Sequence, residues 1–227
     1  MNTPSTRLST NTRSPKVTVV KLGGSLLDVA DLTDRLLAAV SDVEIPIVVV
    51  GGGSAADLVR QWSRQGLVDN SEAHRLAIAA MSFNALHLVE SDRVVESDRG
   101  LTLVKSKDAA LEASLAGRLP LLDTSSALLA EQALFTQYPS LPESWDVTSD
   151  SIAAWLASAW NGDLRLLKSV SSGSAPLDHL DVWFEQASRG LHKLTWINLR
   201  NLPLEVTSLP LPIAQADDRH VPVERCE

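Results

Sequence analysis

Cysteine is almost absent from this chain of 227 residues, because Cys226, the next-to-last residue, is the only one. A disulfide within the chain is therefore excluded, which fits a reducing cytoplasm. Long apolar runs are absent as well. No segment approaches the roughly 20 residues of a membrane-spanning helix, and no apolar stretch of a secretory signal occurs near the N-terminus. We therefore expect a cytoplasmic protein with no membrane partner.

Positive charge is also scarce. The chain holds 20 lysines and arginines against 28 aspartates and glutamates, which gives a formal net charge of −8. A general nucleic-acid-binding surface needs clustered positive charge. We therefore expect no nucleic-acid partner. A nucleotide ligand remains open, because it needs only a local positive pocket.

The length and the hydrophobic fraction of 44% suit one large α/β domain. Residues 1–15 are rich in serine and threonine and contain no acid, so we expect a disordered tail there. A transit peptide has a similar composition, but this segment lacks an amphipathic apolar face. Residues 210–227 are charged and proline-containing, and we expect an irregular tail. The predicted domain therefore spans residues 16–209.

Strand-like and helix-like apolar patterns alternate along this domain. Strands are predicted at residues 16–22, 47–50, 101–104, 119–122, 164–167 and 194–199. Helices are predicted at residues 30–40, 54–65, 70–90, 124–132, 151–160 and 180–188. This alternation predicts a three-layer αβα sandwich with a mainly parallel sheet. Ligands of such sheets bind at the carboxyl ends of the strands, where the strand order switches.

Two glycine-rich turns lie about thirty residues apart, and each follows a short apolar run. The first turn is Lys21-Leu22-Gly23-Gly24-Ser25, and the second is Gly51-Gly52-Gly53-Ser54. We expect a helix to begin after each turn, so that the backbone amides of the turn form an anion site. Two such turns, the first with a lysine, suggest a site that holds two phosphate-bearing groups. This arrangement favours phosphoryl transfer.

Each motif also has an alternative interpretation. Lys21 could extend from a strand end toward solvent. The segment Gly51–Ala56 satisfies the G-x-G-x-x-A dinucleotide fingerprint of a dehydrogenase, with Glu72 as a candidate ribose ligand. That turn follows the second strand rather than the first, however, and a dehydrogenase leaves the Lys21 turn unexplained.

Further candidates lie near the end of the chain. Thr148-Ser149-Asp150 opens a predicted helix, and a helix N-cap alone would explain these residue types. Lys168 ends a predicted strand, where a simple surface lysine is the alternative. His74, on the long helix after the second turn, is a candidate for the acceptor pocket, and a helix-surface histidine is the alternative. No His/Cys/Asp cluster has the spacing of a metal site.

The order Lys21-x-Gly23-Gly24-Ser25, Gly51-Gly52-Gly53 and Thr148-Ser149-Asp150 resembles the amino acid kinase family over about residues 16–200. The resemblance implies an ATP-dependent kinase of a small molecule, with Mg²⁺ arriving on ATP and held largely by phosphates and water. We expect a homo-oligomer.

The resemblance also implies a role for each matching residue. Lys21 and Lys168 would stabilise the transferring phosphoryl group, and Asp150 would orient both lysines. Residues that would bind ATP phosphate are Gly23, Gly24, Ser25, Ser149 and Ser169. Residues that would bind the acceptor are Gly51, Gly52, Gly53, His74 and Asp146. The chain departs from the family pattern at Ser172-Gly173, where relatives of the uridylate kinase type have Asp-Gly, so an acidic role is not expected there.

Three segments, residues 147–155, 166–170 and 196–200, look most like the family branch of aminomethyl-furanmethanol phosphate kinase in methanofuran synthesis. In that case the acceptor is a phosphomonoester and the product a diphosphate. We expect Asp146 to bind the ammonium group of such an acceptor, because it should lie one helical turn before Asp150. Uridylate or isopentenyl phosphate are alternative acceptors. A non-catalytic, nucleotide-binding member, similar to molybdenum-storage proteins of this fold, is a further alternative.

Overall fold

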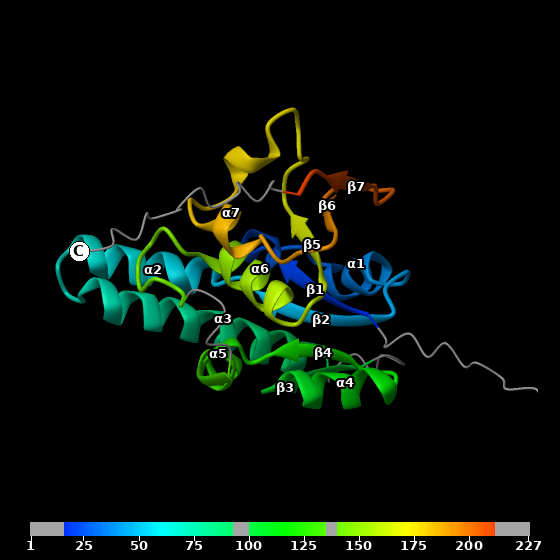
Figure 1. Cartoon of the computed structure of the whole chain (residues 1–227), viewed down its shortest axis with the longest axis horizontal. Helices are drawn as coiled ribbons and strands as arrows, with labels where there is room; N and C mark the ends of the chain where they lie inside the picture. Colours follow the sequence, from blue (N-terminus) through cyan, green and yellow to red (C-terminus); the bar gives the residue numbers. More distant parts are fainter. Residues whose placement is uncertain (1–15, 93–99, 135–139, 212–227) are drawn as a thin grey trace, which may run out of the picture.

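The computed structural model describes residues 16–92, 100–134 and 140–211. Within these residues, a seven-stranded sheet has the order β3-β4-β2-β1-β5-β6-β7 (Figure 1). The strands are β1 (Val17–Leu22), β2 (Ile45–Val50), β3 (Leu101–Val104), β4 (Leu119–Leu122), β5 (Asp163–Lys168), β6 (Leu194–Asn198) and β7 (Val206–Leu209). The α-helices are α1 (Leu32–Ala39), α2 (Gly53–Arg64), α3 (Asn70–Asp92), α4 (Lys107–Leu115), α5 (Thr124–Leu134), α6 (Ser149–Ala159) and α7 (Phe184–Ala187). Two 3₁₀-helices, η1 (Gly24–Leu26) and η2 (Pro176–His179), complete the elements.

The sheet is parallel from β3 to β6, and only β7 pairs in the antiparallel direction. The strands β2, β4 and β3 lie on one side of β1, with β3 at the edge, and the chain then crosses over so that β5 pairs with the other edge of β1. In this pair Leu22 lies opposite Leu167. The strand order therefore switches at β1, where parallel sheets commonly bind ligands. The predicted α/β fold with a mainly parallel sheet is confirmed.

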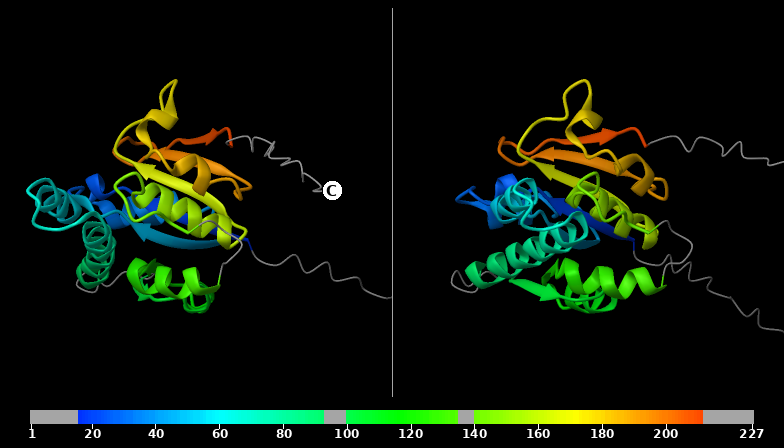
Figure 2. Two further views of the ribbon diagram at one scale, coloured as in Figure 1. Left: turned by 60° about the vertical axis from the view of Figure 1, so that its left-hand side comes forward. Right: turned by 90° about the vertical axis from the view of Figure 1, so that its left-hand side faces the viewer.

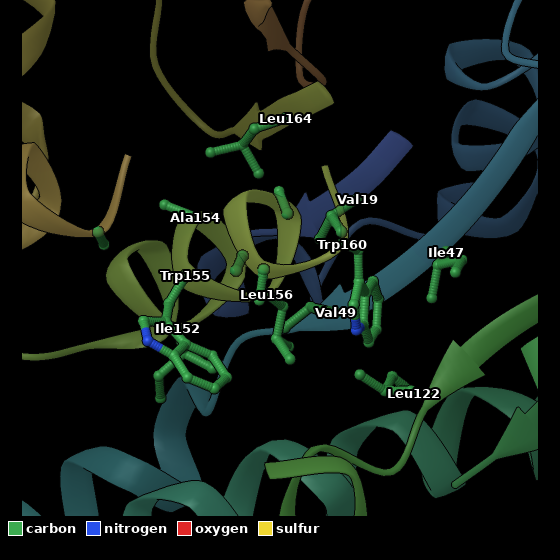
Figure 3. Packing of buried hydrophobic residues seen from close by; sticks show 14 of the residues in the cluster. Val19, Ile47, Val49, Leu122, Ile152, Ala154, Trp155, Leu156, Trp160 and Leu164 are labelled. Atoms are coloured by element: carbon green, nitrogen blue, oxygen red, sulfur yellow. The ribbon is translucent and has the colours of Figure 1, made fainter. Parts of the chain in front are cut away.

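Helices cover both faces of the sheet, as Figure 2 shows. On one face, α6 packs across β1, β2 and β5, and every residue of α6 from Asp150 to Ala159 is buried. Figure 3 shows this core, to which the strands contribute Val19, Ile47, Val49, Leu122 and Leu164, and α6 contributes Ile152, Trp155 and Leu156. A helix that is apolar on all sides is typical of the interior of a domain.

The opposite face carries a second core, to which Val20, Leu22, Val48 and Val50 contribute beneath α1 and the end of α3. Side chains alternate between the two faces along each strand. Val19 packs on the α6 side, so Lys21, two residues later, also lies on that side. By the same alternation, Leu164 and Leu166 place Lys168 on the α6 side. The strand period alone therefore puts both lysines on the face that α6 covers.

Several local predictions were wrong. No α-helix follows the first glycine turn directly, because Gly24–Leu26 forms the short 3₁₀-helix η1 and buries Leu26. The predicted helix at residues 180–188 shrinks to α7, because Asp181 instead binds the start of α6. The segment between β5 and α7, which contains η2, projects from the sheet (Figures 1 and 2). The helix α4 and the strand β7 were not predicted from the sequence.

The predicted tail at residues 1–15 lies outside the described residues, and so does the predicted tail at residues 210–227 from residue 212 onward. Residues 140–144 have no helix or strand. Among the described helices, none has the length and hydropathy to cross a membrane.

Candidate active site

A carboxylate bridges two lysines at the switch point of the sheet. Lys21 Nζ, at the end of β1, lies 2.8 Å from Asp150 Oδ1, and Lys168 Nζ, at the end of β5, lies 2.6 Å from Asp150 Oδ2. Asp150 belongs to the first turn of α6, which packs over this face of both strands. Lys21 is 4% exposed and Asp150 is 5% exposed. The structure therefore brings together the three residues predicted to be catalytic, of which the first and the last, Lys21 and Lys168, are 147 positions apart.

The charges of this cluster depend on one another. Burial alone would raise the pKa of Asp150, but the ammonium groups of Lys21 and Lys168 outweigh it and hold that pKa below its ordinary value. Burial and the nearby charge of Lys21 lower the pKa of Lys168, and Asp150 partly opposes both effects. One carboxylate thus stabilises two cations that would otherwise repel each other. The cluster carries a net positive charge, which is suited to binding phosphate oxygens.

Lys168 has further contacts that fix its position. Its Nζ donates a hydrogen bond to the backbone oxygen of His179 at 3.2 Å and lies 5.4 Å from the ring centroid of Trp196. The Trp196 ring is itself held, because its Nε1 donates to the backbone oxygen of Val170 at 2.8 Å. The ammonium group is therefore positioned from three sides.

Asp181 caps helix α6, and the sequence analysis missed this role. Its Oδ2 accepts hydrogen bonds from the backbone amides of Thr148 and Ser151 at 3.0 and 3.1 Å, and from Thr148 Oγ1 at 2.6 Å. Ser151 Oγ donates to the other oxygen, Oδ1. Thr148 occupies the N-cap position, but its own side chain does not cap the helix. No local sequence signal identifies a cap residue that lies 30 positions away.

The two glycine turns pack against each other through their backbones. A Cβ atom on Gly24 would lie 2.3 Å from the nitrogen of Gly53, and one on Gly51 would lie 2.6 Å from the nitrogen of Gly24. Gly53 also has a φ of +50°, which glycine adopts at little cost. These glycines are therefore required by the contact between the turns, whether or not a ligand binds.

Part of the expected anion cradle is already in use. The amide of Gly23 donates to the oxygen of Leu167 at 2.9 Å, and the amide of Gly51 donates to the oxygen of Leu22 at 2.8 Å. The Gly23 amide continues the hydrogen bonding between strands beyond the end of β1, and the Gly51 amide continues it beyond the end of β2. Phosphate contacts by the turns must therefore come from the amides that follow Gly23 and Gly51.

Side chains on neighbouring elements hold both turns in place. Ser25 Oγ and Ser169 Oγ lie 3.0 Å apart, so the first turn is joined to the end of β5. Asn84, which is buried on α3, donates from Nδ2 to the oxygen of Gly51 at 2.8 Å. The sequence analysis did not single out Asn84, because an isolated asparagine within a helix carries no positional signal.

A pocket of about 430 Å³ adjoins Lys168 through Trp196. The residues that line it lie after β5, on β6 and around the β6–β7 connection, and they include Ser171, Ser172, Asn198, Arg200 and Glu205. Arg200 Nη2 donates to the oxygen of Ser25 at 2.7 Å and lies 2.6 Å from Asp28 Oδ1. The pocket is therefore connected to the first glycine turn.

A second, small pocket lies at the start of α6, the helix that carries Asp150. Gly52, His74 and Ser149 line it together with Arg60 and Trp145, so it joins the second glycine turn to the start of α6. Ser149 thus lies in this pocket rather than beside Ser169. His74 is 7% exposed, so the alternative of a surface histidine is wrong. Burial lowers the pKa of His74, although a hydrogen bond with the backbone of Ser144 partly opposes this.

Asp146 does not belong to this pocket. Its side chain is exposed, and its backbone oxygen accepts a hydrogen bond from the amide of Trp183 at 3.2 Å. Because α6 begins at Ser149, the expectation that Asp146 lies one helical turn before Asp150 was wrong. The residues that line the pocket include no aspartate or glutamate.

Within the described ranges, no three histidine, cysteine or acidic side chains gather as a metal site. Asp150, the acid at the centre of the cluster, is already bound to two lysines. Asp150 is therefore engaged before any Mg²⁺ arrives, and the phosphates of ATP and water would have to supply most of the ligands of such an ion.

One comparison with a solved structure agrees with this architecture. A similarity search of solved structures finds aspartate kinase from Synechocystis, with a TM-score of 0.53 and 15% identity over 88% of this chain and 40% of that chain. It also finds uridylate kinase from Archaeoglobus fulgidus, with a TM-score of 0.46 and 20% identity over 70% of this chain and 68% of that chain. A comparison with curated protein sequences finds no significant match. The sequence profile of the amino acid kinase family matches residues 16–172, and the chain therefore belongs to the amino acid kinase family.

Proposed function

We propose that residues 16–209 form an ATP-dependent kinase that phosphorylates a small-molecule phosphomonoester. The observation that carries this proposal is the buried contact of Asp150 with both Lys21 and Lys168 at the switch point of the sheet. One pocket adjoins this cluster at Trp196, and another adjoins it at Ser149. A cationic centre between two pockets is suited to moving a phosphoryl group from one ligand to another.

The chemistry that we propose is positioning and charge stabilisation. The acceptor oxygen attacks the γ-phosphorus of ATP, the bond to the β–γ bridging oxygen breaks, and ADP leaves. Lys21 and Lys168 offset the negative charge that develops on the phosphoryl and leaving oxygens. Asp150 holds the two ammonium groups in place, and Mg²⁺ on ATP would neutralise further phosphate charge. Because the catalytic charges are buried, they act with little screening by water.

We assign the larger pocket to the nucleoside part of ATP. It lies next to Lys168 and is linked through Arg200 to the first glycine turn, so a nucleotide in it would direct its phosphates toward the lysines. Ser25 and Ser169, whose hydroxyls lie 3.0 Å apart beside that path, are the proposed phosphate contacts. The smaller pocket at Gly52 and His74 is then the acceptor side.

For the acceptor itself, we propose aminomethyl-furanmethanol phosphate as the first candidate, because three segments of the chain resemble that branch of the family. The phosphate of this acceptor suits the acceptor-side pocket, because the residues that line it include Arg60. Its ammonium group has no carboxylate among the residues that line the pocket. An amine-free analogue is therefore an essential comparison.

ADP release across a panel of acceptors tests the proposal. The panel contains aminomethyl-furanmethanol phosphate, its amine-free analogue, uridylate, isopentenyl phosphate, aspartate and acetylglutamate. We expect ADP release with at least one phosphomonoester, and its absence in the variant Lys168→Met. ATP binding without ADP release would instead support a non-catalytic member, and saturable NADH binding would support the dehydrogenase interpretation. Equal turnover of the amine-bearing and amine-free compounds would overturn the assignment of the furan acceptor.

A further inference from the structure

The acceptor-side pocket is too small for a complete substrate. Its volume is about 40 Å³. A water molecule occupies roughly 10–15 Å³ on this measure, so the pocket has room for a group about the size of three waters. A compact group such as a phosphate or a carboxylate fits this space, and the rest of the acceptor must project from it.

Arg60 on α2 supplies the positive charge of this pocket. It lines the pocket together with Gly52, His74 and Ser149. His74 is buried, and its lowered pKa favours the uncharged ring. The charge that a ligand meets here is therefore that of the Arg60 guanidinium.

The guanidinium of Arg60 is held in place by two neighbours. Its Cζ lies 4.7 Å from the ring centroid of Trp145, and Trp145 Nε1 donates to Ser63 Oγ at 3.3 Å, which ties the ring to α2. Arg60 Nη1 also lies 2.6 Å from Asp57 Oδ1, in a pair whose Asp57 side chain is 69% exposed. A guanidinium has five N–H donors, and this contact leaves others for a ligand.

We propose that Arg60 recognises the anionic group of the acceptor and so determines which acceptors bind. The inference rests on the proposed function, because it assigns the ligand class of the pocket on the acceptor side. An arginine that is stacked on an aromatic ring and is only partly neutralised by an exposed carboxylate is prepared to bind a planar or tetrahedral anion. The acceptor therefore carries a phosphate or carboxylate at the end that enters the pocket, and a neutral compound of the same shape is rejected.

Calorimetric titration with three probes tests this inference directly. Phenyl phosphate, phenylacetate and benzyl alcohol share an aromatic body and differ in charge and in the type of anion. Each is titrated into the full chain, both alone and with saturating AMP-PNP, which blocks the donor side. We expect saturable binding of phenyl phosphate or phenylacetate in both conditions. Comparison of their two Kd values shows whether the pocket prefers a phosphate or a carboxylate. Benzyl alcohol should bind at least tenfold more weakly, because a charge-assisted contact is worth about that factor.

Four variants locate the binding energy. Arg60→Gln should weaken anion binding by about tenfold or more. Arg60→Lys should lose less, because it keeps a point charge without the forked donors. Asp57→Asn should tighten binding by about two- to fivefold, because it releases Arg60 from a partly exposed ion pair. Arg64→Gln, on the exposed end of the same helix, makes the same charge change and should have no effect.

Several results would overturn the proposal. These are unchanged anion binding by Arg60→Gln, an equal loss in Arg64→Gln, or wild-type protein that binds neither anion or binds benzyl alcohol equally well. Thermal unfolding checks that each variant is folded. If Arg60→Gln does not fold, Arg60→Lys serves as the test in its place. Arg60-dependent anion binding without any ADP release would contradict the kinase proposal alone. ADP release with an unchanged acceptor KM in Arg60→Gln would contradict the Arg60 proposal alone.

Discussion

Replacement of Asp150 by asparagine separates the two roles of this carboxylate, which are holding two lysines and holding the fold. The side chain is 7% exposed and contacts Lys21 at 2.8 Å and Lys168 at 2.6 Å. Asparagine has nearly the same shape, but it carries no charge and has only one oxygen acceptor. The variant therefore leaves two ammonium groups close together, with no anion between them.

The expected loss of stability is large. Removing one partner of a buried ion pair costs about 3–5 kcal/mol, which is a large part of the roughly 5–15 kcal/mol that stabilises a typical domain. Asp163→Asn is the matched control, because Asp163 pairs with only one cation, Lys16, at 2.7 Å at the opposite end of β5, where the side chain of Asp163 is 14% exposed and that of Lys16 is 34% exposed. That change should cost less than Asp150→Asn, because it leaves one partly exposed ammonium group rather than two buried ones, and it should leave turnover unchanged. Urea unfolding of both variants measures the difference.

A polyphosphate ligand should compensate for the missing carboxylate. If Lys21 and Lys168 bind ATP phosphates, AMP-PNP supplies the anion that Asp150→Asn lacks, so it should stabilise this variant more than the wild type. A ligand that binds only the folded protein raises the free energy of unfolding by about 2.7 kcal/mol when its concentration is about 100 times Kd. Turnover should nevertheless fall by about 10²–10³-fold, because the lysines are no longer fixed.

The pH dependence provides a further check. Burial already lowers the pKa of Lys168, and loss of Asp150 removes a contribution that raises it. Below the ordinary lysine pKa of 10.5, the unfolded chain then binds more protons than the folded variant, so the free energy of unfolding of the variant should rise with pH more steeply than that of the wild type. Asp150→Asn protein with wild-type stability, and with no added stabilisation by AMP-PNP, would refute the reasoning.

Three further predictions concern single residues. Lys21→Ala should lower kcat by about 10²–10³-fold in the ADP-release assay; unchanged turnover would remove Lys21 from the mechanism. Gly24→Ala should lower the Tm even without ligand, because its Cβ would lie 2.3 Å from the nitrogen of Gly53; a normal Tm with weakened ATP binding would show that only phosphate needs this glycine. Because burial lowers the pKa of His74, the unfolded state binds more protons as the pH falls. Urea unfolding at pH 7.5 and 5.5 should therefore show a smaller acid-induced loss in His74→Gln, and equal losses would contradict this.

Features that depend on residues close in sequence could be predicted from the sequence alone. β-Branched runs predicted β1 and β2, and the strands Leu101–Val104 and Leu119–Leu122 have the predicted bounds. The two glycine turns and the lysines at strand ends were recognisable in the same way, because periodicity and turn chemistry act over a few residues. Resemblance to a family supplied the roles of these residues, which local patterns do not give.

The active-site geometry was decided by contacts between distant segments. Lys21 and Lys168 approach each other because β5 pairs with β1, and local propensity does not determine which strands become neighbours. Asp181 caps α6 although it lies 30 residues after Ser151. The amides of Gly23 and Gly51 donate hydrogen bonds to neighbouring strands and are therefore not free to bind a ligand. Each of these contacts depends on two segments that only the folded chain brings together.

The acceptor side shows the same division most clearly. The sequence marked His74 and Asp146 as candidates, and packing buried the first and left the second exposed. Arg60 and Trp145 carried no signal, because they are 85 positions apart and become neighbours only when the segment before α6 folds over α2. The sequence by itself thus determined the elements and the chemical groups at their ends. The tertiary structure decided which of those groups face one another, because strand pairing and helix packing bring together residues that no local pattern connects.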